Sequence, residues 1–171
     1  MSAKMYQQTT LRALRDHFDD VRAEWAVTKG ASDALRFSVI YAPRVDIAVG
    51  PFNTVKDNTL SRRGEILACA THPIIKRIVK REPEFAFNPN PRCLLAVEIE
   101  FGGSSKHILG DFTNASMMGL VGVVIAPPDN FEKASRIYRY VGFIRNVHKA
   151  PAGLFRNLVL FQTDEFLRLL A

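Results

Sequence analysis

The sequence predicts an α/β domain with a mixed central sheet flanked by helices, and three observations support this class. Residues 93–101 alternate as a strand does, residues 106–118 follow with helical spacing, and residues 120–126 are apolar throughout. A wholly apolar run is typical of a strand that is buried on both faces and parallel to its neighbour. Such a strand–helix–strand unit takes a right-handed crossover.

Composition limits the classes of protein that fit. The 171 residues include 23 lysines and arginines against 17 acidic residues, so the net charge is +6 and an acidic partner such as nucleic acid is favoured. A chain of this length supports one well-packed core, so residues 1–171 are expected to form a single domain. No apolar run reaches the ~20 residues that cross a bilayer. The N-terminus lacks a signal-peptide pattern, and the two cysteines suggest no disulfide framework, so a cytoplasmic protein is expected.

The first 50 residues are expected to form one helix and two short strands. Residues 10–27 place apolar side chains at three- and four-residue steps, which predicts a surface helix that ends at Gly30. Residues 36–41 alternate as a strand, Pro43 marks a turn, and residues 46–49 form the next strand.

Residues 52–92 are expected to form a basic helical insertion before the third strand. Segments 58–70 and 73–81 are the predicted helices of this insertion, and Pro73 suits a first helical turn. Seven basic residues stand against three acidic ones between Lys56 and Glu82. A solvated helix face would explain this charge, but a phosphate-binding surface would gain affinity by releasing counterions. The candidate nucleic-acid-binding residues are Arg62, Arg63, Lys76, Arg77, Lys80 and Arg81.

The C-terminal part is expected to add a helix, a strand and a final helix. Asp129 and Glu132 suggest a capping box for a helix that ends near Asn146. Its basic and aromatic residues alternate in a way that suits nucleic acid, although many helices of this kind bind none. Residues 158–162 form the last predicted strand, and Thr163 is expected to cap the final helix.

Two carboxylates lie side by side on one face of the predicted strand 93–101. Alternate residues of a strand point to opposite faces, so Glu98 and Glu100 share the face of Leu94 and Ala96. Half-buried like charges repel unless a cation lies between them, and hard oxygen ligands suit Mg²⁺ or Mn²⁺. The alternative is an edge strand whose glutamates keep it soluble.

Asp46 and Glu24 are two further candidate site residues. Asp46 stands in a strand, where aspartate is uncommon, so it either caps local backbone amides or serves as a ligand. Glu24 lies at the margin of the first helix, either solvated or turned toward a site. The sequence contains no GxGxxG, P-loop, GxSxG or HExxH motif, and its four histidines form no pair at ligand spacing.

The element order, together with Arg44-Val45-Asp46 and Glu98-Ile99-Glu100, resembles the PD-(D/E)XK nuclease superfamily, whose restriction-endonuclease-like fold has an αβββαβ core. The variant it resembles has glutamate in place of the usual lysine, as in BamHI-like restriction enzymes. The resemblance covers roughly residues 11–126. Lys106 is the nearest candidate to replace the missing lysine.

The resemblance implies a metal-dependent endonuclease that hydrolyses phosphodiester bonds of DNA. Asp46 and Glu98 would bind Mg²⁺ or Mn²⁺ with the Ile99 carbonyl, and Glu100 would orient or deprotonate the attacking water. Glu24 would be an additional acid. DNA is the expected partner, a homodimer is left open, and no membrane partner is expected.

Two other classes were weighed against a nuclease. The first is a nucleic-acid-binding or assembly domain that has the same fold but no hydrolytic activity. The second is a glycoside hydrolase, for which two carboxylates suffice. The positive net charge and the placement of both glutamates on one strand argue against the glycoside hydrolase.

Overall fold

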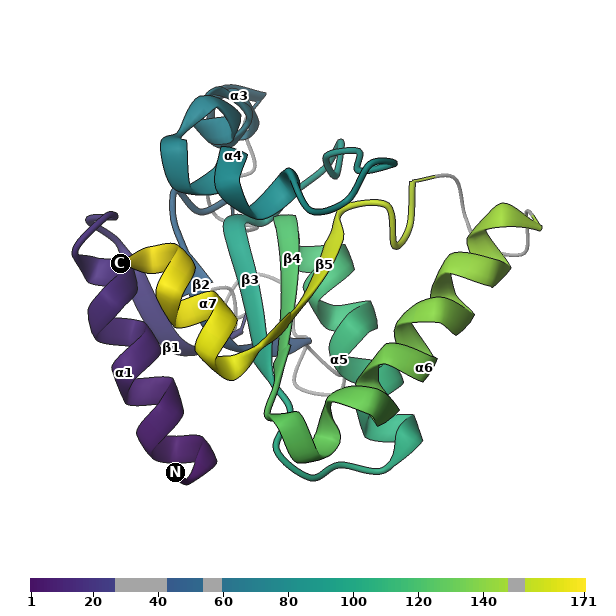
Figure 1. The fold of residues 1–171 in the computed structure, drawn as a ribbon. Coiled ribbons are helices and arrows are strands. Elements are labelled where there is room, and N and C mark those ends of the chain that lie inside the picture. The colour runs from purple at the N-terminus through teal and green to yellow at the C-terminus, as the bar shows by residue number, and fades with distance from the viewer. Residues whose placement is uncertain (27–42, 54–59, 148–152) are drawn as a thin grey trace, which may run out of the picture.

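A five-stranded mixed sheet with the order β1-β2-β3-β4-β5 forms the centre of the fold (Figure 1). The computed structural model describes residues 1–26, 43–53, 60–147 and 153–171. Its strands are β1 (Val21–Ala26), β2 (Arg44–Val49), β3 (Cys93–Ile99), β4 (Gly119–Ala126) and β5 (Leu158–Gln162). The first three strands pair antiparallel in succession, whereas β3, β4 and β5 run parallel. The predicted α/β class and the mixed sheet are therefore confirmed.

Helices cover both faces of this sheet. The first face packs against α1 (Ala3–Arg15), α3 (Leu60–Ala68), α4 (Pro73–Val79) and α7 (Thr163–Leu170). The second face packs against α5 (Ser105–Met118) and α6 (Pro128–Asn146). None of the helices in the described ranges is both long enough and apolar enough to span a membrane.

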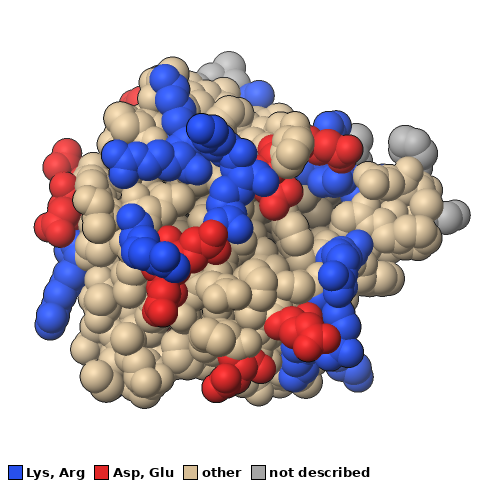
Figure 2. All heavy atoms as spheres, in the orientation of Figure 1, with Lys and Arg blue, Asp and Glu red and all other residues tan. Residues whose placement is uncertain are grey.

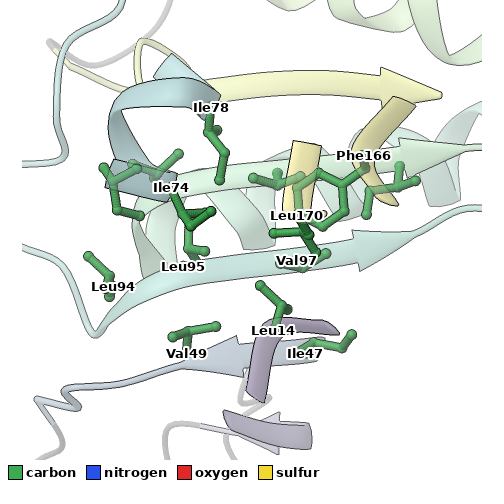
Figure 3. Packing of buried hydrophobic residues seen from close by; sticks show 14 of the residues in the cluster. Leu14, Ile47, Val49, Ile74, Ile78, Leu94, Leu95, Val97, Phe166 and Leu170 are labelled. Carbon is green, nitrogen blue, oxygen red and sulfur yellow. The ribbon is translucent and has the colours of Figure 1, made fainter. Parts of the chain in front are cut away.

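Alternation along the strands divides the apolar core into two parts. Ile47, Leu95 and Val97 point to the first face, where Figure 3 shows side chains of α1, α4 and α7 packed upon them. Ala48 and Ala96 point to the second face. Each aliphatic side chain buried in this way contributes about 1.5–3 kcal/mol. The sheet therefore forms a rigid support for the residues at its ends.

The predicted helix at 10–27 is wrong, because the structure divides this segment into a helix and a strand. Helix α1 begins at Ala3, where Ser2 caps it, and ends at Arg15, while β1 begins at Val21. Val21 and Trp25 are four residues apart, and this spacing places two side chains on one face in a strand as well as in a helix. The pattern therefore did not distinguish the two structures. Gly30 and the predicted strand at 36–41 lie outside the described residues.

Other predicted elements are confirmed within a few residues, but two predicted caps are wrong. Helix α6 begins after Pro127 without a side-chain capping bond, so Asp129 and Glu132 form no capping box. Proline at the start of a helix has a suitable φ and lacks the N–H that a cap would satisfy. Thr163 is the first residue of α7, and the cap position is Gln162.

Candidate functional site

An acidic cleft lies where β2 begins and β3 ends. The register of β2 with β3 ends at the pair Ile47–Val97, and Asp46 and Glu98 are the next residues of the two antiparallel strands. The Asp46 N–H contacts the Glu98 carboxylate, so this end of the pairing brings together two acids that are distant in the sequence. Both acids line a cleft of about 380 Å³.

Backbone N–H groups hold these two carboxylates. The Ile99 N–H donates to Asp46 Oδ2 at 2.8 Å, and the Asp46 N–H donates to Glu98 Oε2 at 3.3 Å. Asn114 of α5 donates from Nδ2 to Glu98 Oε1 at 3.3 Å. The side chains thus continue the link between β2 and β3. Ile99 was expected to offer its carbonyl to a metal, and the contact observed here is made by its N–H.

Glu100 follows the end of β3, one residue later than the strand itself, and the next turn fixes it. Its Oε1 accepts hydrogen bonds from the Gly102 N–H at 2.7 Å and from the Gly103 N–H. Asn130 of α6 donates to the same oxygen at 3.3 Å, and Lys133 Nζ donates to the Gly103 carbonyl at 2.5 Å. The turn and its acid are therefore tied to α6.

A fourth carboxylate, Asp111 of α5, lines the cleft and was missed by the sequence prediction. It shares a hydrogen bond with the side chain of Glu100. His107 and Asn114 line the same cleft, because residues spaced by three or four lie on one helix face. The sequence did contain an indication of this site, namely the spacing of His107, Asp111 and Asn114 along one face of the helix that follows the acidic strand.

Burial of the cleft acids shifts their pKa values upward. Burial, followed by the charges of Asp46 and Asp111, raises the pKa of Glu98 to about 9. Burial also raises the pKa of Asp46, against the opposing hydrogen bond from Ile99. Charged forms of these acids are thus disfavoured while no cation accompanies them.

Glu100 and Asp111 form a carboxyl pair whose members shift in opposite directions. Burial and the hydrogen bond to Glu100 raise the pKa of Asp111. Burial also opposes the charge of Glu100, but the N–H groups of Gly103 and Gly102 and the bond with Asp111 outweigh it and lower its pKa. The pair therefore titrates as a unit in which Asp111 binds a proton more readily than Glu100 does.

The cleft offers the donor types that a hard divalent cation prefers, namely carboxylate oxygens. Within the described part of the chain, no three Asp, Glu, His or Cys side chains lie close enough to hold one ion as they stand. Glu98 and Glu100 would have to exchange hydrogen bonds for a cation, which would also compete with the protons on Glu98 and Asp111. The residues therefore fit a cation in type, after side-chain rotation.

Glu24 lies beside the cleft on β1, and its predicted place on the first helix is wrong. Its carboxylate accepts a hydrogen bond from Gln7 Nε2 at 2.9 Å and lies 3.3 Å from Arg44 Nε. With Gln7, Asp46 and others it lines a second hollow of about 410 Å³ next to α1. Lys106 is exposed in the first turn of α5 and does not line the cleft.

The predicted basic surface lies at the other end of the sheet from the cleft. Helices α3 and α4 connect the end of β2 with the start of β3, and Figure 1 shows them beyond that end. Lysines and arginines gather over this region in Figure 2. Several of these residues make internal contacts: Arg62 with Glu65, Arg77 with the Leu169 carbonyl, and Arg81 with Glu165 and the Phe161 ring.

Comparisons with models of protein families, with curated proteins and with solved structures find no match to this chain. A functional interpretation therefore depends on the geometry of the cleft, on its charges and on the order of the surrounding elements.

Proposed function

We propose that this chain is a Mg²⁺- or Mn²⁺-dependent endonuclease of the PD-(D/E)XK type that cuts DNA. The observation that carries the proposal is the placement of Asp46 opposite Glu98, with Glu100 beside them, at one end of the sheet. The element order supports it: apart from the insertion of α3 and α4 between β2 and β3, the succession α1-β1-β2-β3-α5-β4 corresponds to the αβββαβ core expected from the resemblance. Perturbed acids in a cleft are typical of functional sites.

Each acid has a separate role in this proposal. Asp46 and Glu98 would hold the cation, which when bound lowers the pKa of water and stabilises charge on a phosphate. Glu100 is fixed through Oε1 by two backbone N–H groups, so it is placed to orient or deprotonate the attacking water. Asn114 orients Glu98, and Asp111 holds a proton against Glu100.

The basic residues of α3 and α4 fit the same proposal as more distant phosphate contacts. From Asp46 to the end of β2 the strand rises by roughly 10 Å. One turn of duplex DNA measures about 34 Å, so a bound duplex reaches from the cleft to the insertion. Lys76 of α4 and Lys80 directly after it are both exposed and are the clearest candidates.

A binding or assembly domain without hydrolysis is the second candidate, and one observation favours it. The described acids do not form a ready three-ligand metal group, so the cleft could serve electrostatic or structural purposes alone. The two candidates differ in whether a metal binds and in whether DNA is cut.

The deciding experiment incubates the protein with long duplex DNA of mixed sequence, in Mg²⁺, Mn²⁺ or EDTA. Cutting is expected with either metal and not in EDTA. Glu98→Gln and Asp46→Asn should each reduce cutting by about 10²-fold or more. DNA binding in EDTA should be kept or tightened, because a negative charge near phosphate is removed.

Glu132→Gln is the matched control, since Glu132 is an exposed acid on α6 outside the cleft. A metal titration followed by thermal unfolding gives a readout that needs no DNA: Mg²⁺ should raise the Tm of the wild type more than that of Glu98→Gln. Binding of varied duplexes without cutting in any metal would favour the second candidate.

A further inference from the structure

Among the residues that the structure describes, Arg44 is the arginine that lines the acidic cleft. It is the first residue of β2, two positions before Asp46, and its side chain is 66% exposed. Its carbonyl accepts a hydrogen bond from Asn114 Nδ2 at 3.4 Å, which anchors its backbone to α5. A polyanion that approaches the cleft acids is repelled unless a cation lies at the rim, and Arg44 occupies such a position.

The residue paired with Arg44 has an unusual backbone. Glu24 has a φ of 47°, in the left-handed region, which for a residue other than glycine costs on the order of 1 kcal/mol or more. The register pairs of β1 and β2 form on both sides of Glu24 and Asp46 but omit these two residues. Strain of this kind persists where the surrounding structure maintains it, commonly at functional sites.

Packing around Glu24 and Asp46 indicates that β1 and β2 each exchange their two faces at these residues. Val21 belongs to the core beneath α1, whereas Trp25 belongs to the core beneath α5, although a regular strand would place them on one face. Ile47 and Val45 are divided between the two cores in the same way. Asp46, between them, consequently lines both the cleft and the second hollow.

Gln7 connects Glu24 to this turning point. Its Nε2 donates to Glu24 Oε1 at 2.9 Å and to the Asp46 carbonyl at 3.0 Å. The opposite oxygen of Glu24 faces Arg44 Nε at 3.3 Å. A chain of contacts therefore links the rim arginine, through Glu24 and Gln7, to the strand position that carries a cleft acid.

The Arg44–Glu24 pair is suited to exchange its partner. Exposed ion pairs contribute about 0–1 kcal/mol, because solvent screens them, so little opposes the release of Arg44. A guanidinium binds a phosphate through two parallel charge-assisted hydrogen bonds, which are stronger and more directional. Phosphate can therefore replace the Glu24 carboxylate.

We propose that Arg44 binds a backbone phosphate of the nucleic acid adjacent to the one at the cleft acids. Glu24 is the partner of Arg44 in the free protein and holds the guanidinium at the rim until the phosphate replaces it. This inference rests on the proposed function, for which it names a substrate contact. Lys4, which lines the second hollow with Glu24, extends the cationic rim along α1. Glu24 thereby has a role other than the metal-site acid expected from the sequence.

The first test measures the salt dependence of binding to a fluorescent mixed-sequence duplex in EDTA. Arg44→Ala should reduce the slope of log K against log salt by ~0.9, the value for one lost phosphate contact. Arg44→Lys should restore the slope, because one cation again neutralises the phosphate. Arg22→Ala is the matched control: Arg22 is an exposed arginine of β1 that pairs with Asp20 at 2.7 Å and does not line the cleft. Equal slopes for Arg44→Ala and Arg22→Ala would overturn the contact.

The second test is a double-mutant cycle for Glu24. Glu24→Gln should tighten DNA binding several-fold in the wild-type background and leave it unchanged in the Arg44→Ala background. An equal gain in both backgrounds would make Glu24 a general repulsive charge and overturn its role as the partner that phosphate replaces. If the wild type cuts DNA while Arg44→Ala behaves as Arg22→Ala, only this inference fails. If the wild type neither binds nor cuts, the proposed function fails with it.

Discussion

The two ends of β3 are equally buried but chemically opposite. At its beginning, Leu94 and Leu95 are 1% and 0% exposed and pack among other aliphatic side chains. Just beyond its end, Glu100 is 6% exposed, and Glu98 is 5% exposed. Burial of an aliphatic side chain stabilises the fold, whereas burial of a carboxylate is unfavourable unless the group is protonated or paired.

This difference separates the residues that maintain the fold from those that call for a functional explanation. At the end of the sheet next to α3 and α4, ion pairs such as Arg62–Glu65 lie at the surface and contribute little to the stability of the fold. Solubility alone would explain charges of this kind. The acidic end buries Glu98 and Glu100, leaves Asp46 and Asp111 only partly exposed, and shifts the pKa values of all four. An arrangement that opposes stability is retained where a site requires it.

The largest effect is expected from Gly103→Ala at the acidic end. A Cβ at Gly103 would overlap Glu100 Oε2 and come within 2.9 Å of His107 Cβ, so the carboxylate must move. Under the proposed function Glu100 acts in catalysis, and displacement of such a group commonly costs about 10²-fold in rate, so the loss should be measured in kcat/KM for DNA cleavage. Gly102→Ala is the matched control, because nothing lies within 4 Å of a Cβ there. Equal losses in the two variants would contradict a role for the Glu100 position.

The sequence allowed prediction of the acidic strand, the helix after it and the parallel strand β4, since each pattern depends on local spacing. It also singled out Asp46, Glu98 and Glu100. Their proximity was predicted only through the family resemblance, because local spacing does not reveal the antiparallel register of β2 with β3. Asp111 escaped notice because a polar residue on a helix has no visible partner until the helix is packed.

The wrong helix at 10–27, and with it the wrong place of Glu24, show a different limit of prediction from sequence. A spacing of four residues fits both a helix and a strand, so Val21 and Trp25 could not distinguish them. Glu24 moved from a helix margin to a strained strand position, and nothing in the residue type signals a positive φ. The separation of the basic insertion from the cleft follows from chain connectivity alone, once the direction of each strand is known.

A smaller effect is expected in the pH dependence of stability in the metal-free protein. The pKa of Glu98 is about 9 in the folded chain against an ordinary 4.5, so between these values the folded state binds a proton that the unfolded state has released. The free energy of unfolding should therefore fall as pH rises through this window. Denaturant unfolding in EDTA at stepped pH measures it.

Glu98→Gln provides the control, because an amide does not titrate. Its unfolding free energy should decline less than that of the wild type between pH 4.5 and 9, and Mg²⁺ should reduce the decline of the wild type. Parallel curves for the two proteins would show that Glu98 does not carry this proton.

The smallest effect is expected at the insertion end, where His72 should respond to pH with the opposite sign. Its Nδ1 accepts the Ile74 N–H at 3.2 Å and so caps α4, and its ring lies 4.4 Å from that of Phe18. Burial, followed by the charge of His17, lowers the pKa of His72 from 6.5. Only the unprotonated nitrogen accepts a hydrogen bond, so protonation removes the cap.

The unfolded chain thus takes up this proton at a higher pH than the folded chain. Stability from the cap should be complete above about pH 6.5 and be lost as pH falls below it, by about 1 kcal/mol, the usual contribution of an N-cap. His72→Asn keeps a capping acceptor that does not titrate, so its unfolding free energy should lack this decline, apart from a constant offset for the lost Phe18 contact. A decline of equal size in His72→Asn would assign the titration to another group.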